Sequence, residues 1–347
     1  MADEARKDWD VTWSHQVEGR VGAVLAIDDK ALIAAGPLLR LLDADGEFIW
    51  RREFTFDVYR VDTNGKTIGV LSGIGFFLLD LSSGELLGEG RAVAGGFRDL
   101  SPRPGGGWVL LDRGDHIHLF NRRGRGIQRL KPGPLRQLVG WLDRELLLVL
   151  DMDGCLRCLR LTGEMAQRRI EDRRWSWVSR LARGRMLMQA ADGSIHEGVP
   201  NPFGWDSFEG VSEAGLLPLA AAWTGEGWWL LQMSGDLCLL PPLEDDVGEP
   251  AGDLLAGNGI DRLVTATRDG LVRMWVASHL ADRRRLLLEE MASAELSRLD
   301  WKQRETIFEA ARDAEEAGML SRAIELYEAL GRIEDVRRLL ALREGAS

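Results

Sequence analysis

Length, composition and charge exclude several classes of protein. The chain has 347 residues, of which 45% are hydrophobic, so it can bury a large core as one big domain or two. No apolar run reaches roughly 18 residues, and the first residues lack a signal-peptide layout, so we expect a cytoplasmic protein without membrane insertion. Three cysteines disfavour a disulfide framework. A net charge of -11 would repel a phosphate backbone, which argues against nucleic acid as a partner.

The stretch LLRLLDADGEFIW at residues 38–50 contains two apolar runs separated by Asp-Ala-Asp-Gly. A calcium-binding loop built around Asp45 and Gly46 would need oxygen ligands at positions that Leu41 and Arg52 occupy. Asp and Gly readily supply the backbone angles of a tight turn. A hairpin turn between two strands is therefore the better interpretation.

This hairpin recurs along the chain. A polar-glycine turn followed by a short apolar strand returns after 35 to 42 residues, and most units contain a second turn, as in LSSGELLG and NRRGRGIQ. A self-similar unit of about forty residues is typical of a propeller blade. Seven units of four short strands predict a mainly β fold, a seven-bladed β-propeller. The glycines of the first turns are Gly36, Gly73, Gly114, Gly154, Gly193, Gly235 and Gly270.

The two ends of the repeat array complement each other. The seventh unit runs into helical sequence before its outermost strand, whereas residues 10–18 alternate as a strand ahead of the first unit. Their alternation predicts one common face, made of Val11, Trp13, His15 and Val17. A strand lent by one terminus to the last blade removes an exposed sheet edge. We therefore predict that this N-terminal strand closes a propeller spanning residues 10–278.

Beyond residue 278 the apolar spacing changes from two to 3.6, which predicts an α-helical tail over residues 279–347. Asp300 and Gly318 are expected to cap a first helix, and Ser321 and Gly331 a second one, giving a short helical hairpin or repeat region. So short a stub cannot bury its own apolar face. We expect it either to pack on the propeller or to be completed by another chain.

Three patterns resemble known families. The hairpins DADGEFIWRREF and LSSGELLGEG resemble the quinoprotein-type (PQQ-like) propeller repeat, and LVTATRDGLVRMW resembles the ending of a WD repeat. The tail over residues 301–343 is similar to a tetratricopeptide-like, coatomer-type helical repeat. These resemblances imply architecture, because propellers host enzymes, receptors and scaffolds alike. The calcium site and disulfide pair of quinoprotein dehydrogenases do not map onto this sequence.

The common signatures of phosphate binding, zinc hydrolysis and serine catalysis are absent from the sequence. Cys155 and Cys158 form a C-x-x-C inside a predicted strand, where residues three apart face opposite sides. We interpret both as packing residues. Cys238, in the equivalent strand two blades later, supports this interpretation.

His116 and His118 are predicted to share a strand face and could bind a metal as a pair. Asp115 beside them could orient an imidazole. Because no third ligand lies nearby in sequence, a hydrogen-bonded polar face is the favoured interpretation.

The segment EDRRWSWVSR provides the candidate recognition residues Arg173, Arg174, Trp175 and Trp177. We expect them where a loop between two blades enters the next strand. Arginine and tryptophan are enriched at interface hot spots. The alternative is a packing role, with one tryptophan buried and the other half-exposed.

Two classes of function remain open. In the first, the protein is a non-catalytic scaffold that binds other proteins through its propeller loops and its tail, where Tyr327 and Leu330 are the candidate interaction residues. Its partner would be a cytoplasmic ATPase or GTPase, or a solenoid-containing subunit. In the second, the central channel binds a small ligand or a metal, as in a sensor or enzyme. The absence of a convergent acid, base or metal set favours the first class, with no cofactor.

Overall fold

A computed structural model of the chain describes residues 9–90, 92–161, 166–212, 215–240, 249–280, 308, 310–315, 319–329, 335 and 338–339. The chain divides into two compact units, Met1–Ala281 and Asp282–Ser347. No helix among the described residues is both long enough and apolar enough to span a membrane.

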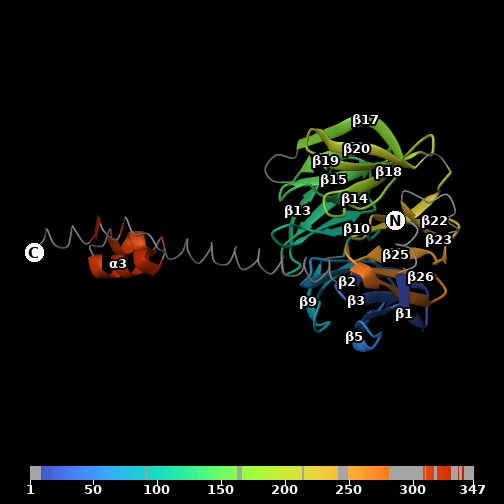
Figure 1. The fold of residues 1–347 in the computed structure, drawn as a ribbon, viewed down its shortest axis with the longest axis horizontal. Helices are drawn as coiled ribbons and strands as arrows, with labels where there is room; N and C mark the ends of the chain where they lie inside the picture. The colour runs from blue at the N-terminus through green and yellow to red at the C-terminus, as the bar shows by residue number, and fades with distance from the viewer. Residues whose placement is uncertain are drawn as a thin grey trace, which may run out of the picture. The chain divides into compact units, whose positions relative to one another are not determined.

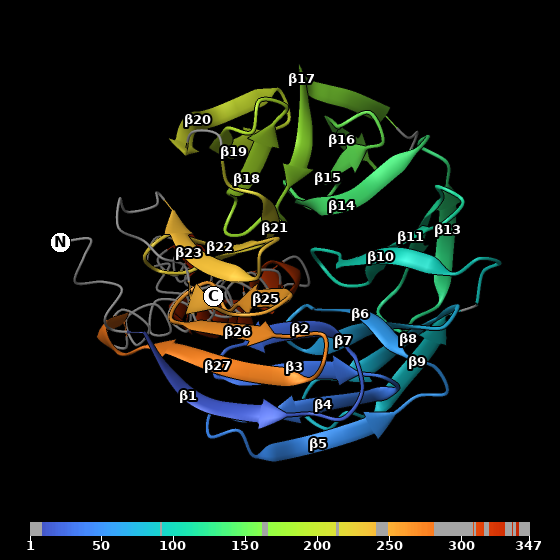
Figure 2. The same cartoon turned by 90° about the vertical axis from the view of Figure 1, so that its right-hand side faces the viewer.

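The first unit is a ring of seven antiparallel blades, which Figures 1 and 2 show from two directions. Each blade has four strands, numbered outward from the ring centre. Blade 1 contains β2 (Val21–Ile27), β3 (Lys30–Ala35), β4 (Leu38–Leu42) and β5 (Phe48–Glu53). Blade 2 contains β6 (Val58–Thr63), β7 (Thr67–Ser72), β8 (Gly75–Asp80) and β9 (Leu86–Gly90). Blade 3 contains β10 (Phe97–Pro102), β11 (Trp108–Asp112), β12 (Ile117–Phe120) and β13 (Gly126–Leu130).

The remaining four blades complete the ring. Blade 4 contains β14 (Leu135–Trp141), β15 (Leu146–Asp151), β16 (Cys155–Arg160) and the first part of β17 (Ala166–Val178). Blade 5 contains the end of β17 with β18 (Met186–Ala190), β19 (Ile195–Asn201) and β20 (Gly204–Ser212). Blade 6 contains β21 (Pro218–Trp223), β22 (Trp228–Gln232), β23 (Asp236–Leu240) and β24 (Glu249–Pro250). Blade 7 contains β25 (Leu254–Gly257), β26 (Arg262–Ala266), β27 (Leu271–Ala277) and β1 (Trp9–Gln16).

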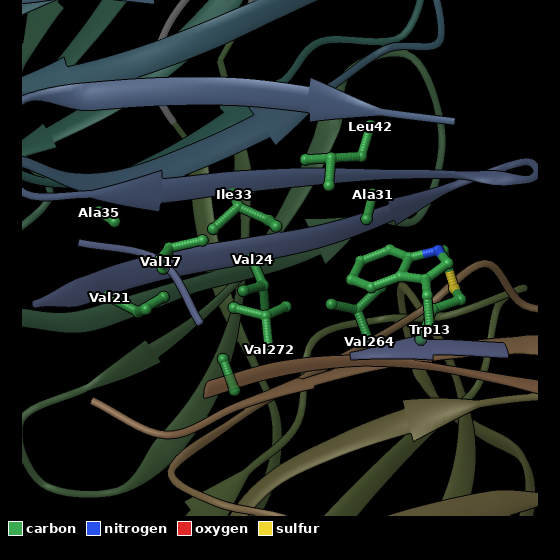
Figure 3. Packing of buried hydrophobic residues seen from close by; sticks show 12 residues of the cluster. Trp13, Val17, Val21, Val24, Ala31, Ile33, Ala35, Leu42, Val264 and Val272 are labelled. Carbon is green, nitrogen blue, oxygen red and sulfur yellow. The ribbon is translucent and has the colours of Figure 1, made fainter. Parts of the chain in front are cut away.

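The N-terminal strand closes the ring, as the sequence predicted. β1 pairs with β27 from Trp9 opposite Ala277 to Gln16 opposite Leu271, and Figure 2 shows the two strands side by side. Trp13 is buried with residues of blades 1 and 7, among them Val24 and Val264 (Figure 3). The two ends of the propeller thus interlock, and one buried cluster joins its first and last blades.

The predicted common face of β1 is wrong at its first position. The pairing register shifts between Val11 and Trp13, so that Thr12 is an extra residue on this strand. The β-bulge breaks the simple alternation of side chains. Trp13 and Val17 are buried, whereas 43% of Val11 is exposed.

Blades 4 and 5 share one continuous strand, which corrects the loop expected ahead of Trp175. β17 pairs with β16 along its first half, with Cys155 opposite Arg174, and with β18 from Trp175 to Val178. Each half therefore finds backbone partners in a different blade, so the chain crosses between blades without leaving the extended conformation.

The turns are hairpins, as predicted. At the second turn of blade 1, Oδ1 of Asp43 accepts the backbone N–H groups of Asp45 and Glu47 at 3.0 and 2.9 Å, and Gly46 adopts φ +84°. The first turns place their glycines at positive φ, except in blade 3, where Asp115 takes this conformation at φ 64° in place of Gly114. Asp tolerates the left-handed region better than most residues.

The second turn of each of the first two blades packs against an aromatic residue of the preceding blade. A Cβ on Gly46 would lie 2.9 Å from Cγ of Trp13, and one on Gly84 would lie 2.7 Å from Cδ2 of Trp50. Nε1 of Trp50 donates to the carbonyl of Leu81 at 2.9 Å. These contacts explain why both turns contain glycine: each turn needs a backbone without a side chain where the ring of the preceding blade lies.

The second unit contains α3 (Leu320–Ala329), preceded by a helical stretch at residues 310–315. Alanines and larger side chains together form its buried cluster. The helix begins one residue before Ser321, and the expected caps Asp300, Gly318 and Gly331 lie outside the described residues. The buried residues of the cluster are Ala311, Ala314, Ala323, Ile324, Tyr327 and Leu339.

Candidate interaction surface and central channel

The innermost strands of all seven blades surround a central channel of about 840 Å³. Arg180, just after β17, carries the main polar contact across it. Its guanidinium pairs with Asp62 of blade 2, with 3.2 Å between Nη1 and Oδ2, and with Asp99 of blade 3. Asp99 also pairs with Arg60 at 3.1 Å and accepts the backbone N–H of Leu138 at 2.8 Å. One buried carboxylate thus connects four blades.

The four charges of this cluster, two arginines and two aspartates, compensate one another. The neighbouring charge of Arg180 lowers the pKa of Arg60 most strongly, with Asp99 acting in the opposite direction. Burial raises the pKa of Asp62, and the charge of Arg180 opposes this. Among the described residues, no group of three or more His, Cys, Asp or Glu side chains could hold a metal ion.

The face of the ring at which the blades are joined carries one group of the exposed apolar side chains. We call it the connection face: there each blade's last strand joins the next blade, and the turns between second and third strands lie beside these joints. Antiparallel pairing places both kinds of segment on the same side. Its exposed apolar residues, with their exposed fractions, are Phe56 (61%), Ile74 (53%), Met152 (60%), Leu217 (59%) and Met233 (69%).

Four of these residues form two pairs. In blade 2, a Cβ on Gly73 would lie 2.7 Å from the ring of Phe56, so this ring rests on the turn that contains Ile74. In blade 6, the backbone N–H of Met233 donates to the carbonyl of Leu217 at 2.8 Å. Both pairs join an inter-blade connection to a turn and present apolar surface to solvent.

The predicted residues Arg173 and Trp175 come together in a cluster at the start of blade 5. The Arg173 guanidinium lies 5.4 Å from the Trp175 ring centroid and 5.1 Å from that of Phe208. His196 stacks on Phe208 at 5.0 Å. Nε1 of Trp175 donates to Glu171 at 2.9 Å, and only 2% of Trp175 is exposed. The arginine is thus held over two aromatic faces.

The other two predicted residues lie elsewhere. Arg174 is exposed opposite Cys155. Trp177 is half-buried, lines the channel and packs toward the core between blades 5 and 6. The alternative with one buried and one half-exposed tryptophan therefore describes the positions of Trp175 and Trp177.

His196 and Phe208 could not be predicted as members of this cluster, since nothing in their local sequence points to Arg173. The strand pairing of β19 and β20 brings them there, with Gly198 opposite Phe208. Burial lowers the pKa of His196 most, and the charge of Arg173 lowers it further.

The histidine pair forms a hydrogen-bonded polar site. Nε2 of His118 lies 2.8 Å from Oδ2 of the buried Asp112, whose Oδ1 accepts the backbone N–H of His116 at 2.8 Å. Asp112 orients the imidazole, which corrects the expectation for Asp115. The latter carboxylate pairs with Arg98 at 2.5 Å. Although burial acts to raise it, these hydrogen bonds lower the pKa of Asp112.

The cysteines are packing residues. Cys155, Cys158 and Cys238 are all buried and unbonded to one another. Burial raises the pKa of the Cys158 thiol, with the charge of Asp143 acting in the same direction. A thiol kept protonated is a poor nucleophile and a poor metal ligand.

In the second unit, Tyr327 is buried and its hydroxyl donates to Glu315 at 3.1 Å, while Leu330 lies outside the described residues. Burial raises the pKa of Tyr327 most, followed by the contacts with Glu315. The same carboxylate accepts two hydrogen bonds from Arg338, at 2.5 and 3.0 Å.

The ring and its closure define a seven-bladed β-propeller. No protein-family model matches the chain, and no curated protein matches it in sequence. Many solved structures match its fold. One is the β-propeller domain of Cps50 (Swd1) from Myceliophteria thermophila, with a TM-score of 0.61 and 14% sequence identity, covering 78% of this chain and 100% of that one. At this identity the similarity concerns the fold alone.

Proposed function

We propose that the protein is a non-catalytic scaffold that binds another protein across the connection face of its propeller. The exposed apolar pairs of blades 2 and 6 support this proposal most directly. Isolated exposed apolar residues are ordinary, but paired ones on one face are typical of protein interaction sites. Such residues form the buried centre of an interface when a partner covers them.

The alternative is a small ligand in the central channel. Its volume of about 840 Å³ lies within the range of ligand pockets. However, Arg60 and Arg180 already pair with Asp62 and Asp99, so a charged ligand that used these two arginines would have to break their ion pairs. The scaffold is therefore the function that this geometry favours.

The finer features of the proposal follow from the sequence. The propeller over residues 10–278 would act with the tail over residues 279–347, which we propose as a tetratricopeptide-like region. Tyr327 would stabilise the tail and Leu330 would contact the partner. The partner would be a cytoplasmic ATPase or GTPase, or a subunit containing a helical solenoid.

The test is affinity purification of tagged full-length chain from its native cells, with mass spectrometry of bound proteins. Replacing Phe56 and Ile74 together by serine should remove a reproducible partner. Phe203→Ser is the matched control, because Phe203 is 75% exposed in a turn on the opposite face. Recovery of the same proteins with wild type and both variants would refute a role for the connection face.

A further inference from the structure

Charge is distributed unevenly along this acidic chain. Residues 97–178, from β10 to the end of β17, contain 16 arginines and lysines against 10 aspartates and glutamates, although the totals are 44 and 55. This part of the ring is therefore basic in an otherwise acidic protein. A local excess of one sign attracts partners of the opposite charge.

Five exposed residues bring this charge to the connection face of blades 4 and 5. We call them the basic-apolar patch: Lys131, Arg136, Met152, Arg173 and Arg174. They come from the loop before β14, from β14 itself, from the turn after β15 and from β17.

Backbone contacts hold these segments together. The N–H of Met152 donates to the carbonyl of Pro134 at 3.4 Å, which joins the turn after β15 to the loop before β14. The N–H of Trp175 donates to Gly154 at 2.8 Å, which joins the same turn to β17. The loop before β14, the turn after β15 and β17 therefore lie side by side, and the turn carries the exposed side chain of Met152.

Arg173 is preorganised to bind an anion. Its guanidinium lies 5.4 and 5.1 Å from the ring centroids of Trp175 and Phe208, and the two centroids are only 6.0 Å apart, so both rings lie on the same side of it. The N–H donors lie in the guanidinium plane and fit a carboxylate with two parallel hydrogen bonds. No described residue accepts a hydrogen bond from this guanidinium. Less side-chain entropy is lost on binding, because the contacts with the two rings already restrict the side chain.

We propose that the basic-apolar patch binds an acidic segment of a protein partner, with carboxylates on Arg173 and Arg174 and an apolar side chain on Met152. The proposal rests on the scaffold function and names the chemistry of one partner segment. An extended polyanion such as nucleic acid is disfavoured as the partner by the net charge of -11. The exposed carboxylates of Asp153 and Asp172, which are close in sequence to Met152 and Arg173, also disfavour it.

The experiment uses purified full-length protein and a short fluorescein-labelled peptide of glutamates around a central leucine pair. Fluorescence anisotropy should show binding that weakens as salt is raised. Replacing Arg173 and Arg174 together by glutamine should reduce the affinity at least about tenfold, or about 1.4 kcal/mol. Arg173→Lys keeps the charge but loses the planar fork, so we expect a smaller loss, about threefold.

The control is the other arginine pair of the same strand. Arg168 and Arg169 are exposed, and Arg168 lies 5.0 Å from the ring of Phe203, on the side of the opposite face. Replacing this pair by glutamine removes the same charge and should change the affinity less than about twofold. Unchanged melting temperatures would show that each variant is folded.

Several results would overturn the proposal. The first is an equal loss of peptide affinity on replacing either arginine pair. The second is no change in anisotropy up to about 1 mM peptide. The third is tighter binding of a single-stranded DNA of equal charge that depends on Arg173 and Arg174. If the peptide fails to bind while the Phe56 and Ile74 variant still loses its cellular partner, this inference fails and the scaffold function stands.

Discussion

Replacing Trp13 by alanine should destabilise the whole propeller, because this residue closes the ring. Trp13 is 8% exposed and packs between blades 1 and 7, in contact with the turn glycine Gly46. A buried tryptophan removes about 150–250 Å² from water, worth about 4–6 kcal/mol at about 25 cal/mol per Å². Measured Trp→Ala losses of about 3–5 kcal/mol agree with this range. Such a loss is large against a typical stability of about 5–15 kcal/mol.

The assay is urea denaturation of the full chain, followed by tryptophan fluorescence and circular dichroism. Val11→Ala is the matched control, since Val11 lies on the same strand but is 43% exposed, and it should cost less than about 1 kcal/mol. If Trp13→Ala lowered the free energy of unfolding no more than Val11→Ala, the N-terminal strand would contribute little to closure and our reasoning would be refuted.

Three further predictions concern other sites. In urea denaturation, Asp99→Ala should lower the free energy of unfolding by about 2–3 kcal/mol, because it leaves buried hydrogen-bond donors unpaired. Arg180→Ala should lower it less, and the reverse order would contradict our description of the channel. Gly84→Val should lower stability by about 2 kcal/mol or more, since φ +71° and the nearby indole ring both oppose a side chain, and an unchanged melting temperature would contradict this. In NMR titrations, Arg173→Gln should raise the pKa of His196, because the charge of Arg173 lowers it. Because the folded protein favours neutral His196, this residue contributes stability that is complete above its unfolded pKa of about 6.5. That stability is lost as the pH falls through the pKa of the folded state.

The architecture could be predicted because its signals are local. Each turn contains its own polar-glycine pattern, and apolar and polar residues alternate along most strands. The number of blades therefore follows from counting these turns. Closure of the ring was predictable for a similar reason. The seventh unit lacks its outermost strand, and the sequence ahead of the first unit contains one additional strand that can take its place. The bulge at Thr12 could not be read from the sequence, because it depends on the partner strand β27.

The candidate surface was predictable only in part. Arg173 and Trp175 stand out through their residue types, whereas Phe208 and His196 reach them through pairing registers that no local pattern encodes. The partner of His118 shows the same limit, since the sequence neighbour Asp115 turns away and Asp112 comes from the adjacent strand. Side chains on different strands meet according to the pairing register of these strands, which proximity in the sequence does not reveal.

The pairing of β1 with β27 also has a consequence for synthesis on the ribosome. Trp9 finds its place only when Ala277 has emerged. At about 5–20 residues per second, the first strand therefore waits on the order of 15–50 s without its partner. During that time the backbone groups and apolar side chains of this strand have no partner on the nascent chain, which exposes it to aggregation. This exposure ends only when the last blade has been synthesised.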